Sequence, residues 1–257
     1  MIIQFIGCGN MGEIILNSII KSKIKCEIYI KTRTMEKENM LKEKYKVNLG
    51  INKDADIVIL AIKPNQFKEI NLNIFNKNTI IISIMAGISI KKIKEKSLSD
   101  KIIRTMPNTP SLVGKGIIGY TATNNILKNE IQLFKKLFSK TGKTIALNNE
   151  DEINKITALS GSGPAYYYYF TEAIINIAKE MGLSKDISKI IGYNTFFGAG
   201  ALLEKSNLDI ETLRKNITSP GGTTQKAIEI FESNNFKNSI EKAIKGAYKK
   251  AKELNNN

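Results

Sequence analysis

The first half of the chain alternates short apolar runs with charged, helix-favouring stretches, and this alternation restricts the possible folds more than any other feature. Residues 2–6 are apolar apart from Gln4, which is typical of a strand buried on both faces of a sheet. Strands that alternate with helices predict βαβ units and a parallel sheet. The predicted strands cover residues 2–6, 27–30, 57–61, 80–84, 102–106, 117–120 and 144–147.

The second half contains no convincing strand and shows helical periodicity instead. Gly182 is placed to end one helix, Ser184 to cap the next, and Asp209 to cap a short one. We therefore expect an α/β N-terminal domain over residues 1–148 and an all-helical C-terminal domain over residues 149–257. The predicted helices of the second half cover residues 152–159, 165–181, 185–205, 223–232 and 236–254.

Small residues interrupt the predicted helix over residues 185–205. Gly192, Gly198 and Gly200 would each cost about 1 kcal/mol relative to Ala in a helix. They therefore either allow close helix packing or mark a break in the helix. Together with the apolar faces of residues 165–181, this run exceeds what a small helical domain can bury alone. We expect a dimerisation domain here, and a protein that is at least a dimer.

The chain contains no histidine and only two cysteines, Cys8 and Cys26. A Ser-His-Asp triad, a His-ligated zinc and a His proton shuttle are therefore excluded, and no metal site is expected. Free thiols fit a reducing compartment. No segment approaches the ~18 apolar residues that span a bilayer, and no secretory leader precedes the first strand. We expect a cytoplasmic protein whose chemistry uses a cofactor, hydroxyls, carboxylates, lysines or backbone amides.

The formal net charge of +15 raises the question of nucleic-acid binding. The lysines are scattered along the predicted helices rather than gathered in one run. Aromatic residues make up only 7% of the chain, which leaves few platforms for stacking bases. A solvated basic surface that attracts anionic substrates is the preferred interpretation, and no nucleic-acid partner is expected.

A glycine motif follows the first predicted strand and opens a helix from about Glu13, which is the context that a dinucleotide-binding turn requires. The first glycine permits the tight turn, the second lets the backbone approach a pyrophosphate, and the third lets helix and strand pack. Helix amides then face the phosphates. We therefore expect a Rossmann-like dinucleotide-binding domain, in which the cofactor contacts Gly7, Gly9, Asn10, Met11 and Gly12.

The loop after the second strand carries Thr32, Arg33 and Thr34, with no carboxylate before Glu36. NAD-preferring sites place an acidic residue here to bind the ribose hydroxyls. Hydroxyls and a guanidinium suit a 2′-phosphate instead, because Arg binds phosphate oxygens bidentately. The loop predicts NADPH as the cofactor, with NADH possible; an ordinary basic loop is the alternative.

Two further loops end apolar strands, so their residues emerge at the carboxyl edge of the sheet, where ligands bind in open α/β folds. Small residues in the second loop would let a nicotinamide ring approach the backbone. Asn52 is a further predicted cofactor contact. The predicted contacts in the two loops are Ala61, Ile62, Lys63, Pro64, Met85, Ala86 and Gly87.

Three loops later in the chain are rich in proline, glycine and hydroxyl groups. Residues 104–110 contain two prolines and form a stiff loop. Residues 160–165 present hydroxyls and amides that suit a ligand, and Ser162 is a predicted substrate contact; the alternative is a connection that only permits close packing. Residues 218–224 present consecutive amides and hydroxyls at the start of a helix, which favours a carboxylate site over a simple cap.

Taken together, six stretches resemble the pyrroline-5-carboxylate reductase family, in that family's order and over nearly the whole chain. They are residues 5–11, 61–64, 83–88, 104–110, 158–166 and 218–224, of which the last three are highly specific. Cys8 stands where the family usually has a smaller or different residue, and Ile118 replaces a common Thr. The resemblance implies a helical domain that interlocks with its partner in a dimer, in some members built into larger rings.

The resemblance also implies an activity: hydride transfer from NAD(P)H to the imine carbon of 1-pyrroline-5-carboxylate, which gives L-proline in the last step of proline biosynthesis. It implies that Asn216, Gly222, Thr223 and Thr224 bind the substrate, with backbone amides holding its carboxylate. The Thr224 hydroxyl, the catalytic group, would hydrogen-bond the ring nitrogen. A protonated imine is already electrophilic, so the protein mainly orients the reactants, which agrees with the absence of histidine.

Two alternatives are kept. Another imine or β-hydroxyacid NADP-dependent oxidoreductase shares the layout, but a β-hydroxyacid enzyme needs a catalytic lysine in its helical domain. Lys179 and Lys189 are candidates, and neither lies in the expected glycine-rich context. A non-catalytic nucleotide-sensing or nucleic-acid-binding protein is the other class.

Overall fold

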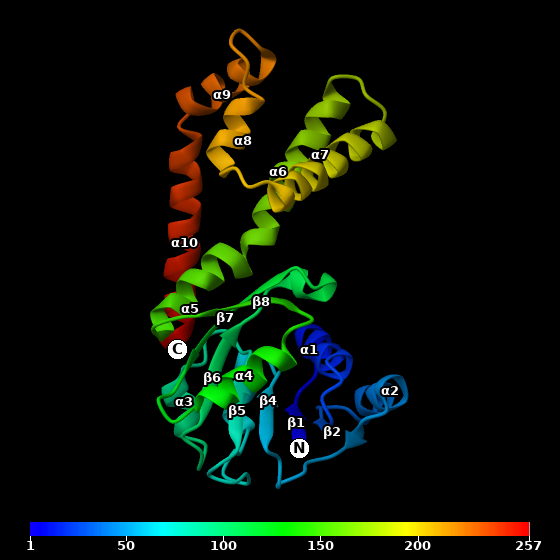
Figure 1. Cartoon of the computed structure of the whole chain (residues 1–257), viewed down its shortest axis with the longest axis vertical. Coiled ribbons are helices and arrows are strands. Elements are labelled where there is room, and N and C mark those ends of the chain that lie inside the picture. The colour runs from blue at the N-terminus through cyan, green and yellow to red at the C-terminus, as the bar shows by residue number, and fades with distance from the viewer. Residues whose placement is uncertain (257) are drawn as a thin grey trace. The chain divides into compact units, whose positions relative to one another are not determined.

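The computed structural model describes residues 1–256, and within them eight strands form one sheet in the order β3-β2-β1-β4-β5-β6-β7-β8 (Figure 1). All seven predicted strands are present, with ends that differ by at most a few residues. The two-residue strand β3, which pairs with β2, is an addition. The strands are β1 (Ile2–Ile6), β2 (Glu27–Lys31), β3 (Asn48–Leu49), β4 (Ile57–Leu60), β5 (Ile80–Ser83), β6 (Ile102–Met106), β7 (Gly116–Ala122) and β8 (Gly142–Ala146).

The predicted parallel sheet is confirmed with one exception: β6 and β7 run antiparallel, with Thr105 opposite Tyr120. A parallel pairing needs a crossover long enough to return to the start of the next strand. Only the 3₁₀-helix η2 (Thr109–Val113) and a few flanking residues join β6 to β7. The chain therefore turns back directly, and β8 then pairs parallel with β7.

Helices cover the sheet because its strands are apolar on both faces. Ile3 and Phe5 belong to one buried cluster, which also contains Ile15 and Leu16 of α1. Ile6 belongs to a second buried cluster, because successive residues of a strand point to opposite faces of the sheet. The elements around the sheet are α1 (Asn10–Lys21), α2 (Met35–Tyr45), η1 (Pro64–Glu69), α3 (Ile90–Lys94), α4 (Lys128–Leu137), α5 (Glu150–Ile156) and the π-helical turn η3 (Thr157–Gly161).

The chain forms two compact units. One contains residues 1–162 together with the C-terminal residues from 247 onward, and the other contains residues 163–246. The first unit reaches beyond residue 148 because α5 packs against β6 and β7, and because the end of α10 (Phe236–Asn256) returns to the sheet domain. The predicted boundary between the two domains, at residues 148 and 149, stays a prediction.

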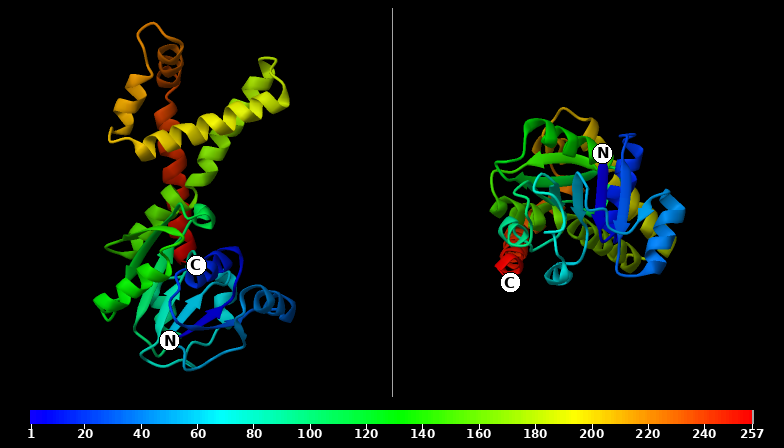
Figure 2. Two further views of the ribbon diagram at one scale, coloured as in Figure 1. Left: turned by 45° about the vertical axis from the view of Figure 1, so that its right-hand side comes forward. Right: turned by 90° about the horizontal axis from the view of Figure 1, so that it is seen from below.

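The second unit is helical, with α6 (Gly163–Glu180), α7 (Lys185–Lys205), α8 (Ile210–Asn216), α9 (Thr223–Ser233) and the first part of α10. Gly182 ends α6 at a φ of 92°, as predicted. The predicted caps are also present: the Ser184 hydroxyl accepts from the Ile187 amide, and the Asp209 carboxylate accepts from the Thr212 amide. In Figures 1 and 2, α7 (yellow) crosses α6 (green).

The glycines of α7 do not break the helix, which is continuous from Lys185 to Lys205, so that alternative is wrong. Gly192 allows the close approach, because a Cβ there would lie 2.5 Å from Ile175 of α6. Gly198 and Gly200 face open space in the single chain. No helix in the described part of the chain is long and apolar enough to cross a membrane.

Candidate functional site

The glycine motif forms a tight turn at the carboxyl end of β1. Gly7 has a φ of 78°, and its amide donates to the carbonyl of Lys31 at 2.7 Å. A Cβ at Gly7 would lie 2.4 Å from Ile62, and a Cβ at Gly12 would lie 2.9 Å from that of Ala61. Gly9 is exposed with open space beside it. The turn therefore has the tight bend, the accessible backbone and the helix–strand contact that a pyrophosphate site needs.

The helix after this turn begins three residues earlier than predicted. Gly9 is the N-cap and α1 starts at Asn10, so Glu13 lies in the first turn rather than at its start. The first amide that donates back within the helix is that of Glu13, to the carbonyl of Gly9 at 2.8 Å. The amides of Asn10, Met11 and Gly12 thus form the open end of the helix, which favours an anion.

Two other predicted loops lie at the same edge of the sheet, because β4 and β5 run parallel with β1. Ala61 and Ile62 follow β4, Lys63 is exposed, and Pro64 begins η1. Met85 and Ala86 follow β5, and Gly87 turns the chain at a φ of 72°. The structure therefore brings the motif of β1 and the loops after β4 and β5 to one edge.

The loop after β2 reaches this edge as well, and a residue that sequence reasoning missed holds it in place. Glu38 of α2 is buried, and its carboxylate accepts from the Thr32 amide at 2.8 Å and pairs with Lys31 at 3.1 Å. Thr34 caps α2, and the Arg33 side chain is exposed. The Glu38 carboxylate is thus engaged with the loop itself, and the Arg33 side chain stays exposed.

Glu13 ties α1 to α2 beside the glycine turn. Its carboxylate accepts from Lys44 at 2.8 Å, Lys37 at 3.0 Å and the Tyr45 hydroxyl at 3.0 Å. These bonds, that of Lys44 above all, lower the pKa of Glu13 to about 2. Burial, with the Glu13 charge, raises the pKa of the Cys8 thiol to about 12. Cys8 is therefore a neutral packing residue in the turn.

Asn52, another predicted cofactor residue, lies shortly after the two-residue strand β3. Its amide donates to the Gln4 side chain at 2.8 Å, and Gln4 is in the middle of β1 rather than at its carboxyl end. Its side-chain oxygen accepts from the Asp54 amide at 3.0 Å, which closes a turn. A role for Asn52 in cofactor binding stays a prediction.

In the second unit, the predicted anion site is the start of α9. Gly222 is the N-cap, but its own amide already donates to the Ser219 carbonyl at 3.1 Å. The Gly221 amide donates to the Gln225 side chain at 2.7 Å. The amides of Thr223 and Thr224 remain as the first two of the helix, where no carbonyl of a preceding turn accepts them. Asn216, the last residue of α8, is exposed.

Ser162 belongs to the first unit, directly after the π-helical turn η3, and its amide donates to the Thr157 carbonyl at 2.9 Å. Sequence reasoning missed the residue that anchors this turn. The Asn108 side chain donates to the Ser160 carbonyl at 3.1 Å and hydroxyl at 3.0 Å, and accepts from the Ile117 amide at 2.9 Å. Asn108 therefore joins two loops that the sequence motifs marked separately.

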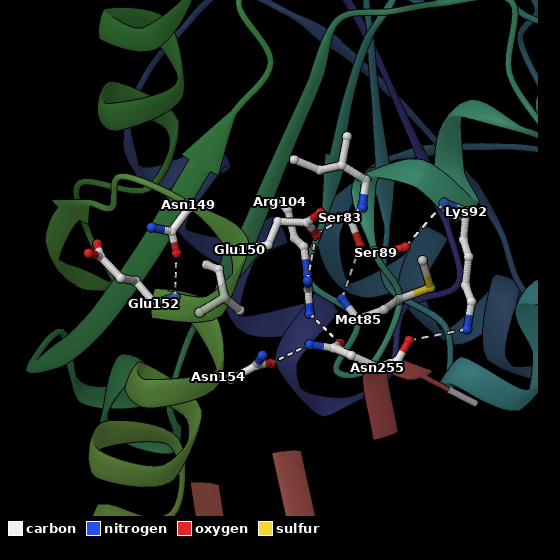
Figure 3. Close-up of polar contacts among 12 residues, drawn as sticks. Ser83, Met85, Ser89, Lys92, Arg104, Asn149, Glu150, Glu152, Asn154 and Asn255 are labelled. Carbon is white, nitrogen blue, oxygen red and sulfur yellow. Dashed lines mark hydrogen bonds and ion pairs between the residues drawn. The ribbon is translucent and has the colours of Figure 1, made fainter. Parts of the chain in front are cut away.

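Arg104 is the largest fully buried side chain in the described residues, and it too was missed as an anchor. Its guanidinium pairs with Glu150 at 2.6 Å and donates to the Asn255 side chain at 2.7 Å (Figure 3). No group of three acidic, cysteine or histidine residues in the described chain could hold a metal ion.

Comparisons with known proteins agree over the whole chain. Residues 150–254 match a family model described as pyrroline-5-carboxylate reductase dimerisation, and residues 2–87 match one described as NADP oxidoreductase, coenzyme F420-dependent. Pyrroline-5-carboxylate reductase 2 of Bacillus subtilis is 35% identical over 98% of this chain and 94% of its own length. The Haemophilus influenzae pyrroline-5-carboxylate reductase is 32% identical over 98% and 97%.

Solved structures give the same result for the fold. A pyrroline-5-carboxylate reductase from Coxiella burnetii is 34% identical, with a TM-score of 0.89 over 98% of this chain and 97% of that chain. The Plasmodium falciparum pyrroline carboxylate reductase, solved with NADP bound, is 28% identical, with a TM-score of 0.80 over 98% and 97%.

Proposed function

The chain belongs to the pyrroline-5-carboxylate reductase family, and we propose which of its residues carry out that family's reaction. The protein is an NAD(P)H-dependent oxidoreductase that reduces the imine bond of 1-pyrroline-5-carboxylate to give L-proline. Its residues have three tasks: to hold the cofactor, to hold the substrate carboxylate, and to keep the ring nitrogen protonated and in place.

The first unit holds the cofactor. The amides of Asn10, Met11 and Gly12 bind the pyrophosphate, supported by the accessible backbone at Gly9. The nicotinamide lies against the loops that follow β4 and β5, that is, against residues 61–64 and 85–87. When bound, the cofactor supplies the hydride.

Arg33, with the hydroxyls of Thr32 and Thr34, binds the 2′-phosphate of the adenosine ribose, so that NADPH is preferred and NADH is accepted. Support comes from the exposed Arg33 side chain and from the engagement of Glu38 with Lys31 and the Thr32 amide. With its carboxylate so engaged, Glu38 does not replace the acidic residue that binds the ribose hydroxyls in NAD-preferring sites.

The second unit holds the substrate. The amides of Thr223 and Thr224, at the open end of α9, bind its carboxylate, and Asn216 lies close in the chain at the end of α8. The Thr224 hydroxyl oxygen accepts the N–H of the protonated imine and so holds the electrophilic form in place until the hydride reaches the ring carbon and the C=N electron pair neutralises the nitrogen. Ser162 stays a predicted substrate contact. The open amides at the start of α9 are the observation that carries this proposal.

The β-hydroxyacid alternative loses support at its catalytic group. Lys189 is exposed on α7, and Lys179 is exposed on α6 with its amine on the Asn176 side chain at 3.0 Å. Neither lies in the enclosed environment that a catalytic lysine needs.

Two assays separate the candidate functions: oxidation of NADPH with the cyclic imine, and reduction of NADP⁺ with a hydroxyacid. We expect turnover with 1-pyrroline-5-carboxylate and none with a β-hydroxyacid and NADP⁺. Turnover of the hydroxyacid alone would support the alternative enzyme, and no turnover of either would support a non-catalytic nucleotide-binding protein.

The protein is a homo-oligomer, in keeping with its dimerisation domain. We propose that dimers assemble further into a ring, that the protein works in the cytoplasm, and that it has no nucleic-acid partner. Its buried, neutral Cys8 suits a reducing compartment, and its lysines pair with carboxylates along several helices rather than forming one stripe.

A further inference from the structure

Three segments that are far apart in the sequence meet at the buried Arg104 side chain of β6 (Figure 3). Its Nη1 atom donates to Glu150 of α5 at 2.6 Å, and its Nη2 atom donates to the Asn255 side-chain oxygen at 2.7 Å. The Asn255 side-chain nitrogen donates in turn to Asn154 of α5. A buried guanidinium needs such partners to offset its lost hydration, so these bonds order the segments around it.

The same groups also form hydrogen bonds around the loop that follows β5. The Glu150 oxygen that pairs with Arg104 also accepts from the Ile90 amide at 2.9 Å, at the start of α3. The Lys92 amine donates to the backbone carbonyl of Asn255 at 3.3 Å. Residues of α5, α3 and the last turn of α10 are therefore joined around one loop.

The last turn of α10 touches this loop at Gly87. A Cβ built on Gly87 would lie 2.8 Å from the carbonyl oxygen of Leu254 and 3.2 Å from its carbonyl carbon. Gly87 also has a φ of 72°, which favours glycine. At its start, the loop is held by the Met85 amide, which donates to the Ser83 hydroxyl at 3.3 Å.

We infer that Asn255 is a positioning residue for hydride transfer: by joining the end of α10 to Arg104, it fixes the Met85–Gly87 loop against which the nicotinamide lies. Asn255 touches neither the cofactor nor the substrate in this arrangement. It acts through Leu254, whose backbone closes over Gly87. The inference rests on the proposed placement of the nicotinamide, since the bonds of Asn255 matter to catalysis only if the nicotinamide ring lies on this loop.

The test replaces Asn255, because the variant Asn255→Ala leaves the Arg104–Glu150 pair intact and changes only the end of the chain. We expect kcat to fall about tenfold, because a small displacement of reacting groups slows the chemical step strongly. The KM for NADPH rises, and the KM for 1-pyrroline-5-carboxylate is unchanged. With NADPH deuterated at the transferred position, the isotope effect on kcat increases, because hydride transfer becomes more rate-limiting.

Two matched variants accompany it. Asn255→Asp keeps an acceptor for Arg104, and the Asn154 amide can rotate to donate to it, so this variant restores kcat and the isotope effect. Asn238→Ala makes the same change at an exposed position of α10 and leaves all parameters at wild-type values.

A lower melting temperature of Asn255→Ala, with unchanged KM for NADPH and unchanged isotope effect, would show a merely structural role and overturn the inference. Failure of the wild-type protein to oxidise NADPH with the cyclic imine is a different result, since it would overturn the proposed function itself.

Discussion

The hydroxyl group of Thr224 is the one catalytic group in the proposed substrate site, which makes it the sharpest single-residue test. Thr224→Val keeps the shape of the side chain and removes one hydrogen bond to a charged nitrogen. Such a bond contributes about 1.5–3 kcal/mol, so kcat/KM should fall very roughly 10- to 150-fold. The affinity for NADPH, measured without substrate, should not change.

Thr224→Ser retains the hydroxyl and should keep most of the activity. If Thr224→Val reduces the cyclic imine as fast as the wild type, the substrate site is not at the start of α9.

Arg33 determines the choice of cofactor in the proposed site. Arg33→Ala removes a guanidinium from an exposed loop that Glu38 holds through the Thr32 amide, so the loop itself should keep its shape. Losing a charge-assisted bond to the 2′-phosphate should raise the KM for NADPH about tenfold. The KM for NADH is the internal control and should stay the same; an equal rise for both cofactors would exclude Arg33 as a phosphate ligand.

Among the elements, the link between α1 and α2 depends on the charge of Glu13. Its pKa in the folded protein is lowered from 4.5 to about 2, chiefly by Lys44. Because this pKa is lowered, the bonds of the Glu13 carboxylate stabilise the folded protein fully above pH 4.5, and this stabilisation is lost as the pH falls towards 2. The free energy of unfolding of Glu13→Gln should therefore depend less on pH between 4.5 and 2 than that of the wild type.

Chemical denaturation at a series of pH values measures this difference. Glu36→Gln, an exposed change in the first turn of α2, is the control and should retain the wild-type pH dependence. Parallel curves for Glu13→Gln and the wild type would mean that the Glu13 bonds contribute little in solution, as is common for ion pairs that water can screen.

At the scale of the whole molecule, a single chain exposes more apolar surface than a monomeric protein usually does. Tyr167, Tyr168 and Tyr169 of α6 are 62%, 62% and 77% exposed, and Phe197 of α7 is 65% exposed. Exposed apolar surface of this extent marks a protein–protein interface. The small residues of α7 that face open space, Gly198 among them, suit the close approach of another helix.

We therefore expect light scattering to give a mass of at least twice the 28.7 kDa of one chain. Gly198→Leu should lower that mass at micromolar concentration without unfolding the chain, because a Cβ at this position would have no atom of another part of the chain within 4 Å. A wild-type mass of one chain, or an unchanged mass for the variant, would contradict dimerisation through this face of α7.

Local features of the chain were predictable from the sequence, because they depend on residues close together along it. The bend at Gly7, the strand pattern and the caps at Ser184 and Asp209 each follow from a few neighbouring residues. The glycine motif and the residues at strand ends were predicted for the same reason, since the carboxyl ends of parallel strands must meet at one edge.

Only the tertiary structure decided the contacts between distant segments. Asn255 reaches Arg104 across 151 positions of the chain, and Asn108 reaches Ser160 across 52. Glu38 turns back to the loop before its own helix, and β7 runs antiparallel because its connection is short. No local pattern marks such partners, since a buried polar group is satisfied by whichever segment the packing brings within reach.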